Sequence, residues 1–207
     1  MRTKINNFWK TFLAVQFDFF IAKKTGNYEL GYESYTQLGV AMTEIEEEMG
    51  FLIVYVSNKK EKARIYFITR GKVHLKELAA LIVSQAPILE AWDFQAGLPA
   101  YRGSTTSLWS EFKFFGDDVY VKQVYVSVHN ISKTYHKIHL TIYVDMNKSF
   151  SKSQLRPVME TFLKVFLGED DYFRHIGRIR MVRRKFSKIN FSPVEELKNL
   201  IAYKSVN

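Results

Sequence analysis

Residues 135–145 read YHKIHLTIYVD, a run in which apolar and polar side chains alternate. Successive side chains of a β-strand point to opposite faces, so the four apolar residues share one face that we expect to pack on a core. These residues are Ile138, Leu140, Ile142 and Val144. The residues expected to face solvent are Lys137, His139, Thr141, Tyr143 and Asp145. The run predicts a half-buried strand of an antiparallel sheet.

A second alternating run, 119–129, precedes this strand and is expected to pair with it. Its valines at 124, 126 and 128 would share the core, which leaves Tyr125, Ser127 and His129 outward. A tight turn around residues 131–133 predicts that Tyr125 lies opposite His139 and that His129 lies opposite Tyr135. We expect an open sheet face rich in Tyr and His.

The last predicted strand, 176–182, adds cations to this face because Arg178 and Arg180 alternate with inward-facing apolar residues. From Arg174 to Lys188 there are seven Lys or Arg residues and no acid. Aromatic side chains beside cations stack bases and neutralise phosphates in single-strand binders, so the candidate binding residues are Tyr125, His139, Tyr143, Arg178 and Arg180. The competing interpretation is a solvated face or one covered by a second layer or a partner, because Tyr is common in strands and no RNP-type aromatic motif is present.

The rest of the chain predicts an α+β protein with a mixed, mainly antiparallel sheet and helices packed on one side. Helices are expected at 8–24, 30–49, 75–85 and 153–167, and a last one begins at Pro193 after a Ser192–Glu195 capping box. Pro157 is expected in the first turn of its helix. Further strands are expected at 51–57, 63–69, 89–96 and 109–115. The order strand, strand, helix, strand thus occurs twice, which indicates either two pseudo-repeated ββαβ halves or coincidence.

The domain prediction is a single globular domain, 1–207, with possible halves 1–96 and 108–207 joined by the loop 97–107. This loop carries Tyr101, Arg102 and several hydroxyls that could hold an anion or a peptide. Its competing role is to connect the two halves.

The composition of the chain indicates which partners and which cellular compartment to expect. The net charge of +9 and the pI of about 9.5 favour an anionic partner, although many basic proteins bind none. Cysteine is absent, which favours a reducing compartment, and Lys10, Gln16 and Asp18 interrupt the apolar N-terminal stretch. We expect a cytoplasmic protein without a membrane span, since no stretch reaches about 18 to 20 apolar residues.

Signatures of catalysis are missing from the sequence. No GxSxG, Walker-type, GxGxxG or HExxH motif occurs, and His136 and His139 would point to opposite faces of a strand. The acidic runs, 44–48 and 169–171, lack a partner that would indicate acid–base chemistry. We therefore predict no catalytic residue, no metal site and no cofactor, and lean against an enzyme.

Two segments resemble a family of uncharacterised bacterial α+β proteins. One is Ala86-Pro87 followed by Trp92-Asp93-Phe94, and the other is the run 167–171, LGEDD, leading to the IGRI of 176–179. The resemblance implies a bacterial cytoplasmic protein. It supplies no functional residue, because the family has no established activity.

These observations favour a non-enzymatic protein-interaction module whose contact surface is the outward sheet face or the loop between Trp92 and Trp109. The alternative is single-stranded nucleic-acid binding through the Tyr/His/Arg sheet face. A third class, an enzyme with a cleft between the halves, predicts a polar pocket near Arg102.

Overall fold

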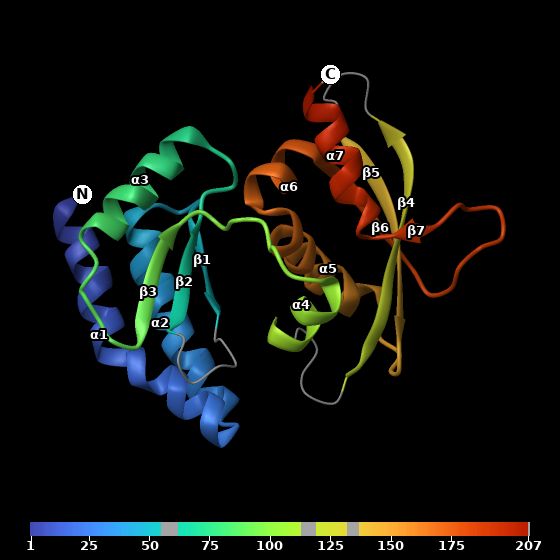
Figure 1. Ribbon diagram of the computed structural model, residues 1–207. Helices are drawn as coiled ribbons and strands as arrows, with labels where there is room; N and C mark the ends of the chain where they lie inside the picture. The colour runs from blue at the N-terminus through green and yellow to red at the C-terminus, as the bar shows by residue number, and fades with distance from the viewer. Residues whose placement is uncertain (55–61, 113–118, 132–136, 207) are drawn as a thin grey trace. The chain divides into compact units, whose positions relative to one another are not determined.

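The computed structural model describes residues 1–54, 62–112, 119–131 and 137–206. It divides into two compact units, Met1–Gly97 (unit 1) and Leu98–Asn207 (unit 2) (Figure 1). Each unit combines helices with its own small mixed sheet, so the α+β prediction is confirmed.

Unit 1 consists of α1 (Arg2–Thr25), α2 (Tyr28–Ile45), β1 (Gly50–Val54), β2 (Ala63–Ile68), α3 (Val73–Ser84) and β3 (Trp92–Ala96). The strand order is β1-β2-β3, with β1 antiparallel and β3 parallel to β2. The parallel pair requires a crossover connection, which α3 supplies. Residues 55–61, between β1 and β2, lie outside the described part of the chain.

The core of unit 1 is aromatic and lies on one face of its sheet. Phe8 and Phe12 of α1 are fully buried, and Trp9 packs edge-on against Phe67 with ring centres 6.0 Å apart. The Trp9 indole N–H also donates a 3.2 Å hydrogen bond to the carbonyl of Ile82 in α3. Residues of α1, α2, α3 and all three strands share this one cluster, so the helices cover a single side of the sheet as predicted.

Unit 2 consists of α4 (Thr105–Phe112), β4 (Val121–Ile131), β5 (Ile138–Met146), α5 (Lys152–Leu167), α6 (Glu169–His175), β6 (Ile176–Val182), β7 (Ser192–Pro193) and α7 (Glu196–Val206). The strand order is β6-β5-β4-β7, in which β4 is antiparallel and β6 parallel to β5. Both units therefore contain two antiparallel strands followed by a helical crossover to a third strand parallel to the second; the crossover is α3 in unit 1 and the two helices α5 and α6 in unit 2. The order of strands expected from the sequence in both halves is thus confirmed, and the choice between a pseudo-repeat and a coincidence stays as the sequence left it.

The predicted inward face of β5 is confirmed, because Ile138, Leu140, Ile142 and Val144 are all buried. Fully buried Met159 and Phe162 of α5 belong to the same unit. Helices α5, α6 and α7 lie on one side of this sheet, and the segment between β6 and β7 projects on the other (Figure 1). We call the side away from the helices the outer face.

The strand predicted at 109–115 is wrong, because residues 105–112 form helix α4. The Ser104 hydroxyl accepts a 3.1 Å hydrogen bond from the Ser107 amide, which is the pattern of a helix N-cap. Leu108 is fully buried from this helix. Residues 113–118 lie outside the described part of the chain.

Two predictions about proline positions are also wrong. Pro193 is not the first residue of a helix. It lies in the short strand β7, where it pairs with Tyr125 of β4, and α7 begins only at Glu196. The Glu195 carboxylate accepts hydrogen bonds from Thr105 and Gln123 instead of capping its own helix. Pro157 lies in the second turn of α5, because a capping box formed by Ser151 and Gln154 starts that helix at Lys152.

Helix α2 begins and ends earlier than predicted. The Asn27 side chain accepts a 3.2 Å hydrogen bond from the Leu30 amide and caps its start. The helix ends at Ile45, where Glu46 takes an extended conformation, so the acidic run 46–48 lies beyond the helix. Glu48 pairs with Lys72, which lowers the pKa of the Glu48 carboxyl through their hydrogen bond and opposite charge.

Candidate binding surfaces

The tyrosines of the outer face of unit 2 pair with each other. Tyr125 of β4 lies opposite Tyr143 of β5, and their rings stack with centres 6.0 Å apart at 26°. The predicted pairing of Tyr125 with His139 is therefore wrong by four residues. Val124 and Val126 are still buried as predicted, because a shift by an even number of residues keeps each side chain on its face. The prediction that Val128 shares this core is wrong, because Val128 is 41% exposed where the pairing with β5 becomes irregular. Tyr135, the predicted partner of His129, lies outside the described residues.

Part of the outer face is covered by the segment that follows β6. Thr141 and Ser127 were both predicted to face solvent. Thr141 is fully buried, and Ser127 is only 6% exposed. The Lys185 ammonium lies 3.1 Å from the centre of the Tyr125 ring, and the Phe191 ring lies 6.5 Å from that of Tyr143. The outer face is therefore not fully solvated, and the expectation of an open sheet face is wrong for this part of it. Desolvation raises the pKa of Tyr143, and the nearby Asp145 and Tyr125 raise it further.

The two arginines lie on β6, which is an edge strand among those described. Arg180 pairs with Thr141, and both Arg178 and Arg180 are exposed. The Arg178 amide donates a 2.8 Å hydrogen bond to Nδ1 of His139. A Cβ on Gly177 would come within 2.7 Å of the same nitrogen, so this glycine permits the contact. Five of the predicted binding residues thus lie on three neighbouring strands.

The other two predicted residues, Tyr101 and Arg102, lie in the segment before α4. The Tyr101 amide donates to the Val165 carbonyl of α5, and its carbonyl accepts a 2.7 Å hydrogen bond from Lys198 of α7. Burial lowers the pKa of Lys198, whose ammonium also lies 4.2 Å from the centre of the Phe166 ring. This segment therefore binds to the helices of its own unit, while the Arg102 side chain is exposed.

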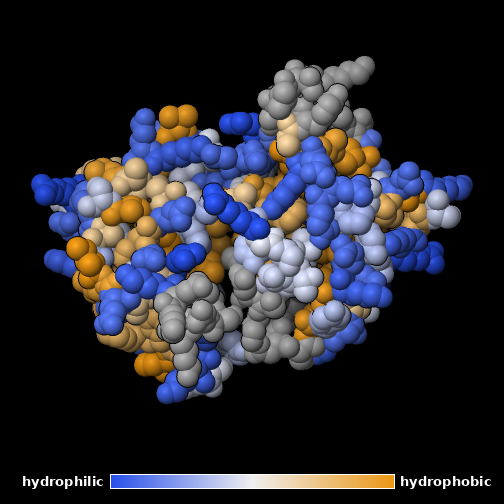
Figure 2. Space-filling view, viewed as in Figure 1, coloured by the Kyte–Doolittle hydropathy of each residue, from blue (hydrophilic) through white to orange (hydrophobic). Residues whose placement is uncertain are grey.

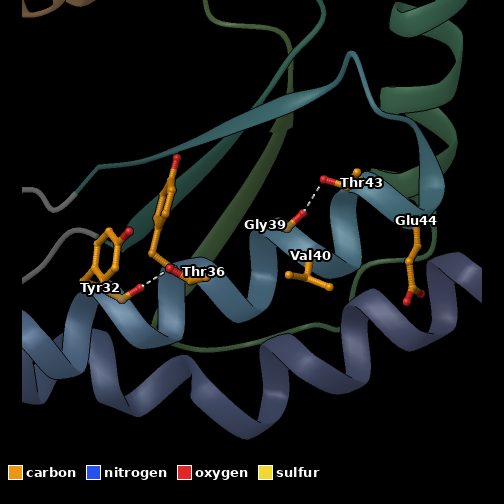
Figure 3. Close-up of a pocket in the computed structure, with 7 residues that line it drawn as sticks. Tyr32, Thr36, Gly39, Val40, Thr43 and Glu44 are labelled. Atoms are coloured by element: carbon orange, nitrogen blue, oxygen red, sulfur yellow. Dashed lines mark hydrogen bonds between the residues drawn. The ribbon is translucent and has the colours of Figure 1, made fainter.

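The sequence did not reveal a shallow hollow on α2 of unit 1, with a volume of about 720 Å³ (Figure 3). Its lining residues are Tyr32, Tyr35, Thr36, Gly39, Val40, Thr43 and Glu44. A Cβ on Gly39 would meet nothing within 4 Å, so the hollow exists because this helical position has no side chain.

The walls of the hollow are held in place by hydrogen bonds within unit 1. The Tyr35 hydroxyl donates to the Phe51 carbonyl at 3.0 Å, and burial raises the pKa of Tyr35. The hydroxyls of Thr36 and Thr43 donate to the carbonyls of Tyr32 and Gly39, as the dashed lines in Figure 3 show. These threonine donors are occupied within the helix, so the hollow offers a partner mainly apolar surface.

Exposed apolar side chains are concentrated in residues 13–40, and three of them, Tyr32, Tyr35 and Val40, line the hollow. Among the described residues fourteen large hydrophobic side chains are exposed, and seven of them belong to residues 13–40: Leu13, Phe17, Ile21, Tyr28, Tyr32, Tyr35 and Val40. Phe17 and Val40 are 64% and 60% exposed. Leu13, Phe17 and Ile21 recur every four residues and so share one face of α1. Figure 2 shows hydrophobic patches on the surface of unit 1.

Charge differs sharply between the two surfaces. Residues 25–58, which include α2, hold six Glu residues and no Lys or Arg. Unit 2 holds 18 of the 30 Lys and Arg residues but only 10 of the 21 Asp and Glu residues. The lining of the hollow is mainly apolar and carries one charged residue, Glu44, whereas the sequence of unit 2 is basic.

The described part of the chain contains no cluster of three or more His, Asp or Glu residues placed to hold a metal ion. None of the described helices is long and apolar enough to cross a membrane. No family model matches the chain, and no curated protein or solved structure is significantly similar to it.

Proposed function

We propose that this chain is a non-enzymatic protein-interaction module that binds a basic, amphipathic segment of a partner protein in the hollow on α2. The observation that carries the proposal is the exposed Tyr32 and Val40 beside Gly39, in a helix whose opposite face is well buried. Concentrated exposed apolar surface of this kind marks interaction sites in soluble proteins. Binding of this kind needs neither a metal nor a cofactor.

The chemistry of the hollow suits an apolar anchor. Covering an exposed aliphatic side chain such as Val40 contributes about 1.5 to 3 kcal/mol when burial is complete. Tyrosines are favourable contact residues because they offer a large surface and lose little conformational freedom. The Tyr35 hydroxyl is already hydrogen-bonded to the Phe51 carbonyl of β1. Its side chain therefore loses less conformational entropy when a partner binds.

The charge of the hollow specifies the partner further. Glu44 lines the hollow, and Glu29 and Glu33 are exposed on the same helix. A partner segment with Lys or Arg around its apolar residues would find complementary charge there. An amphipathic helix laid on a helical groove has this form, with anchors at i, i+3, i+4 and i+7.

This surface takes the place of the outer sheet face and the Trp92–Trp109 loop as the proposed protein contact. Lys185 and Phe191 already cover the tyrosine pair, and Tyr101 is bonded to α5 and α7. The side chains around the hollow on α2 are instead exposed.

The test is a titration of a fluorescent 18-residue amphipathic peptide with leucines on one face and lysines on the other, followed by anisotropy. We expect binding to the wild-type protein and at least tenfold weaker binding to Gly39→Leu, whose side chain fills the hollow. The matched control is Ala80→Leu, which adds the same side chain at an exposed position of α3. A peptide with glutamates in place of the lysines should not bind. Equal binding by both variants, or by both peptides, contradicts the proposal.

A further inference from the structure

The basic surface of unit 2 is independent of the hollow on α2. Arg178, Arg180 and Arg183 are exposed, and none forms an ion pair with another residue in the described ranges. Arg184, Lys185 and Lys188 follow in the segment between β6 and β7, and all three are exposed. Aligned cations that form no ion pair make an anion-binding surface.

We propose that the outer face of unit 2 is a second binding site, whose ligand is single-stranded nucleic acid. The cations on β6 and the segment after it would neutralise phosphates, while Tyr125 and Tyr143 would stack bases. Single-strand binders combine these two elements in one groove. The proposal does not depend on the function proposed for unit 1, because it uses none of the same residues.

Lys185 lies between the cations and the tyrosine pair of the outer face. Its ammonium lies 3.1 Å from the centre of the Tyr125 ring and 5.8 Å from that of Tyr143, so it occupies the ring face that a base would use. A cation over a tyrosine ring is held by about 0.5 to 1 kcal/mol at an exposed site, which is less than the stacking of one base contributes. A phosphate offers the same ammonium a full opposite charge. Binding would therefore move Lys185 from the ring to the phosphate and free Tyr125 for a base.

The pair of tyrosines favours a single strand over other anions. Bases in a duplex are already stacked on one another, so a duplex would contact the arginines but not stack on the tyrosines. An acidic protein would likewise contact the arginines, and it has no bases to stack on the tyrosines. An anionic membrane would likewise bind the cations, and it would also take up the exposed Phe186. The contribution of Tyr125 therefore separates the single-strand assignment from these ligands.

The experiment is anisotropy of a labelled 20-nucleotide single strand, as RNA and as DNA, titrated with the full chain at 50 to 200 mM salt. We expect Arg178→Ala/Arg180→Ala to reduce the slope of log affinity against log salt by about 1.4, since each phosphate contact on a single strand contributes about 0.7. The control Lys4→Ala/Lys10→Ala removes two exposed charges from α1 and should leave the slope unchanged. Tyr125→Leu should weaken binding about tenfold.

Duplex DNA and vesicles containing 30% phosphatidylserine serve as competing ligands. Tighter binding to the single strand, sensitive to both the arginine and the tyrosine variants, supports the proposal. No binding at 50 mM salt, or binding of all three ligands alike without an effect of Tyr125→Leu, overturns it. If Tyr125→Leu does not fold, photocrosslinking of 4-thiouridine RNA to the wild-type chain decides: crosslinks at Tyr125 or Tyr143 support the site, and crosslinks confined elsewhere contradict it.

Discussion

The hydroxyl of Tyr35 donates a 3.0 Å hydrogen bond to the backbone carbonyl of Phe51, and the two rings lie 4.6 Å apart. This contact ties α2 to β1, one of the two edge strands among those described in unit 1, and fixes one wall of the hollow. The surface proposed to bind a partner is therefore built on a rigid helix rather than on a loop. Rigid support of this kind lowers the entropy lost when a partner binds.

Replacing Tyr35 by Phe tests the importance of this contact. The variant keeps the ring but removes the donor, so we expect the free energy of unfolding to fall by about 1 kcal/mol. Urea denaturation followed by circular dichroism measures the change. Tyr32→Phe is the control, since Tyr32 is 73% exposed and should have little effect on stability. Equal losses of unfolding free energy in the two variants would show that the hydrogen bond from Tyr35 to the Phe51 carbonyl does not stabilise the fold.

Two glycines of α2 should respond in opposite ways to alanine. Gly39→Ala should raise the free energy of unfolding by about 1 kcal/mol, because alanine favours the helix and its Cβ meets nothing within 4 Å. At Gly31 the new Cβ would lie 3.1 Å from that of Ala22, where α1 and α2 approach closely, so Gly31→Ala should gain less or lose stability. Denaturant midpoints compare the two variants. A larger gain at Gly31 than at Gly39 would contradict the packing described.

The start of α5 depends on its capping box. Ser151→Ala removes the side-chain acceptor of the Gln154 amide, and the expected loss of stability is about 1 kcal/mol. Ser149→Ala, at an exposed position just before the helix, serves as the control. Thermal unfolding measures both variants. An unchanged midpoint for Ser151→Ala would mean that the hydrogen bonds to Gln154 do not stabilise the helix.

Stability should fall at high pH because three tyrosines are easier to ionise in the unfolded chain. Burial, followed by the charge of Glu160, raises the pKa of Tyr172 to about 12, and the pKa values of Tyr35 and Tyr143 are raised as well. Between the ordinary value near 10 and these raised values, the native state holds more protons than the unfolded state. The free energy of unfolding therefore decreases as pH rises through this window.

The variant Tyr172→Phe isolates one of these contributions. Its free energy of unfolding, measured by urea titration at pH 9, 10 and 11, should decline less steeply than that of the wild-type protein. A steeper decline in the variant would contradict the raised pKa of Tyr172.

The sequence predicted strands with one buried face better than it predicted their pairing. The alternation in residues 138–144 determines which side chains are buried, because a strand has a period of two. The register between β4 and β5 depends on the length of the connection between them, and the tight turn expected around residues 131–133 gave a register four residues away from the observed one. The stacking of Tyr125 on Tyr143 could not be predicted for this reason.

Burial of Thr141 has a different origin. The alternation predicts a solvent-facing Thr141, which is fully buried, and on the same face Lys185 contacts Tyr125 and Phe191 contacts Tyr143. Such a contact between distant segments leaves no local pattern. The hollow on α2, in contrast, had a signal in the sequence: Gly39 in the middle of a helix, where glycine is unfavourable by about 1 kcal/mol.

The most direct test of the proposed function locates the peptide on the protein. Amide spectra of the isotope-labelled chain, recorded while the lysine-rich amphipathic peptide is added, report which residues sense it. Binding in the hollow predicts the largest shifts for the amides of Tyr32, Gly39 and Val40, and these shifts should disappear in Gly39→Leu but persist in Ala80→Leu. Shifts that are absent, or that concentrate away from α2, would contradict the account.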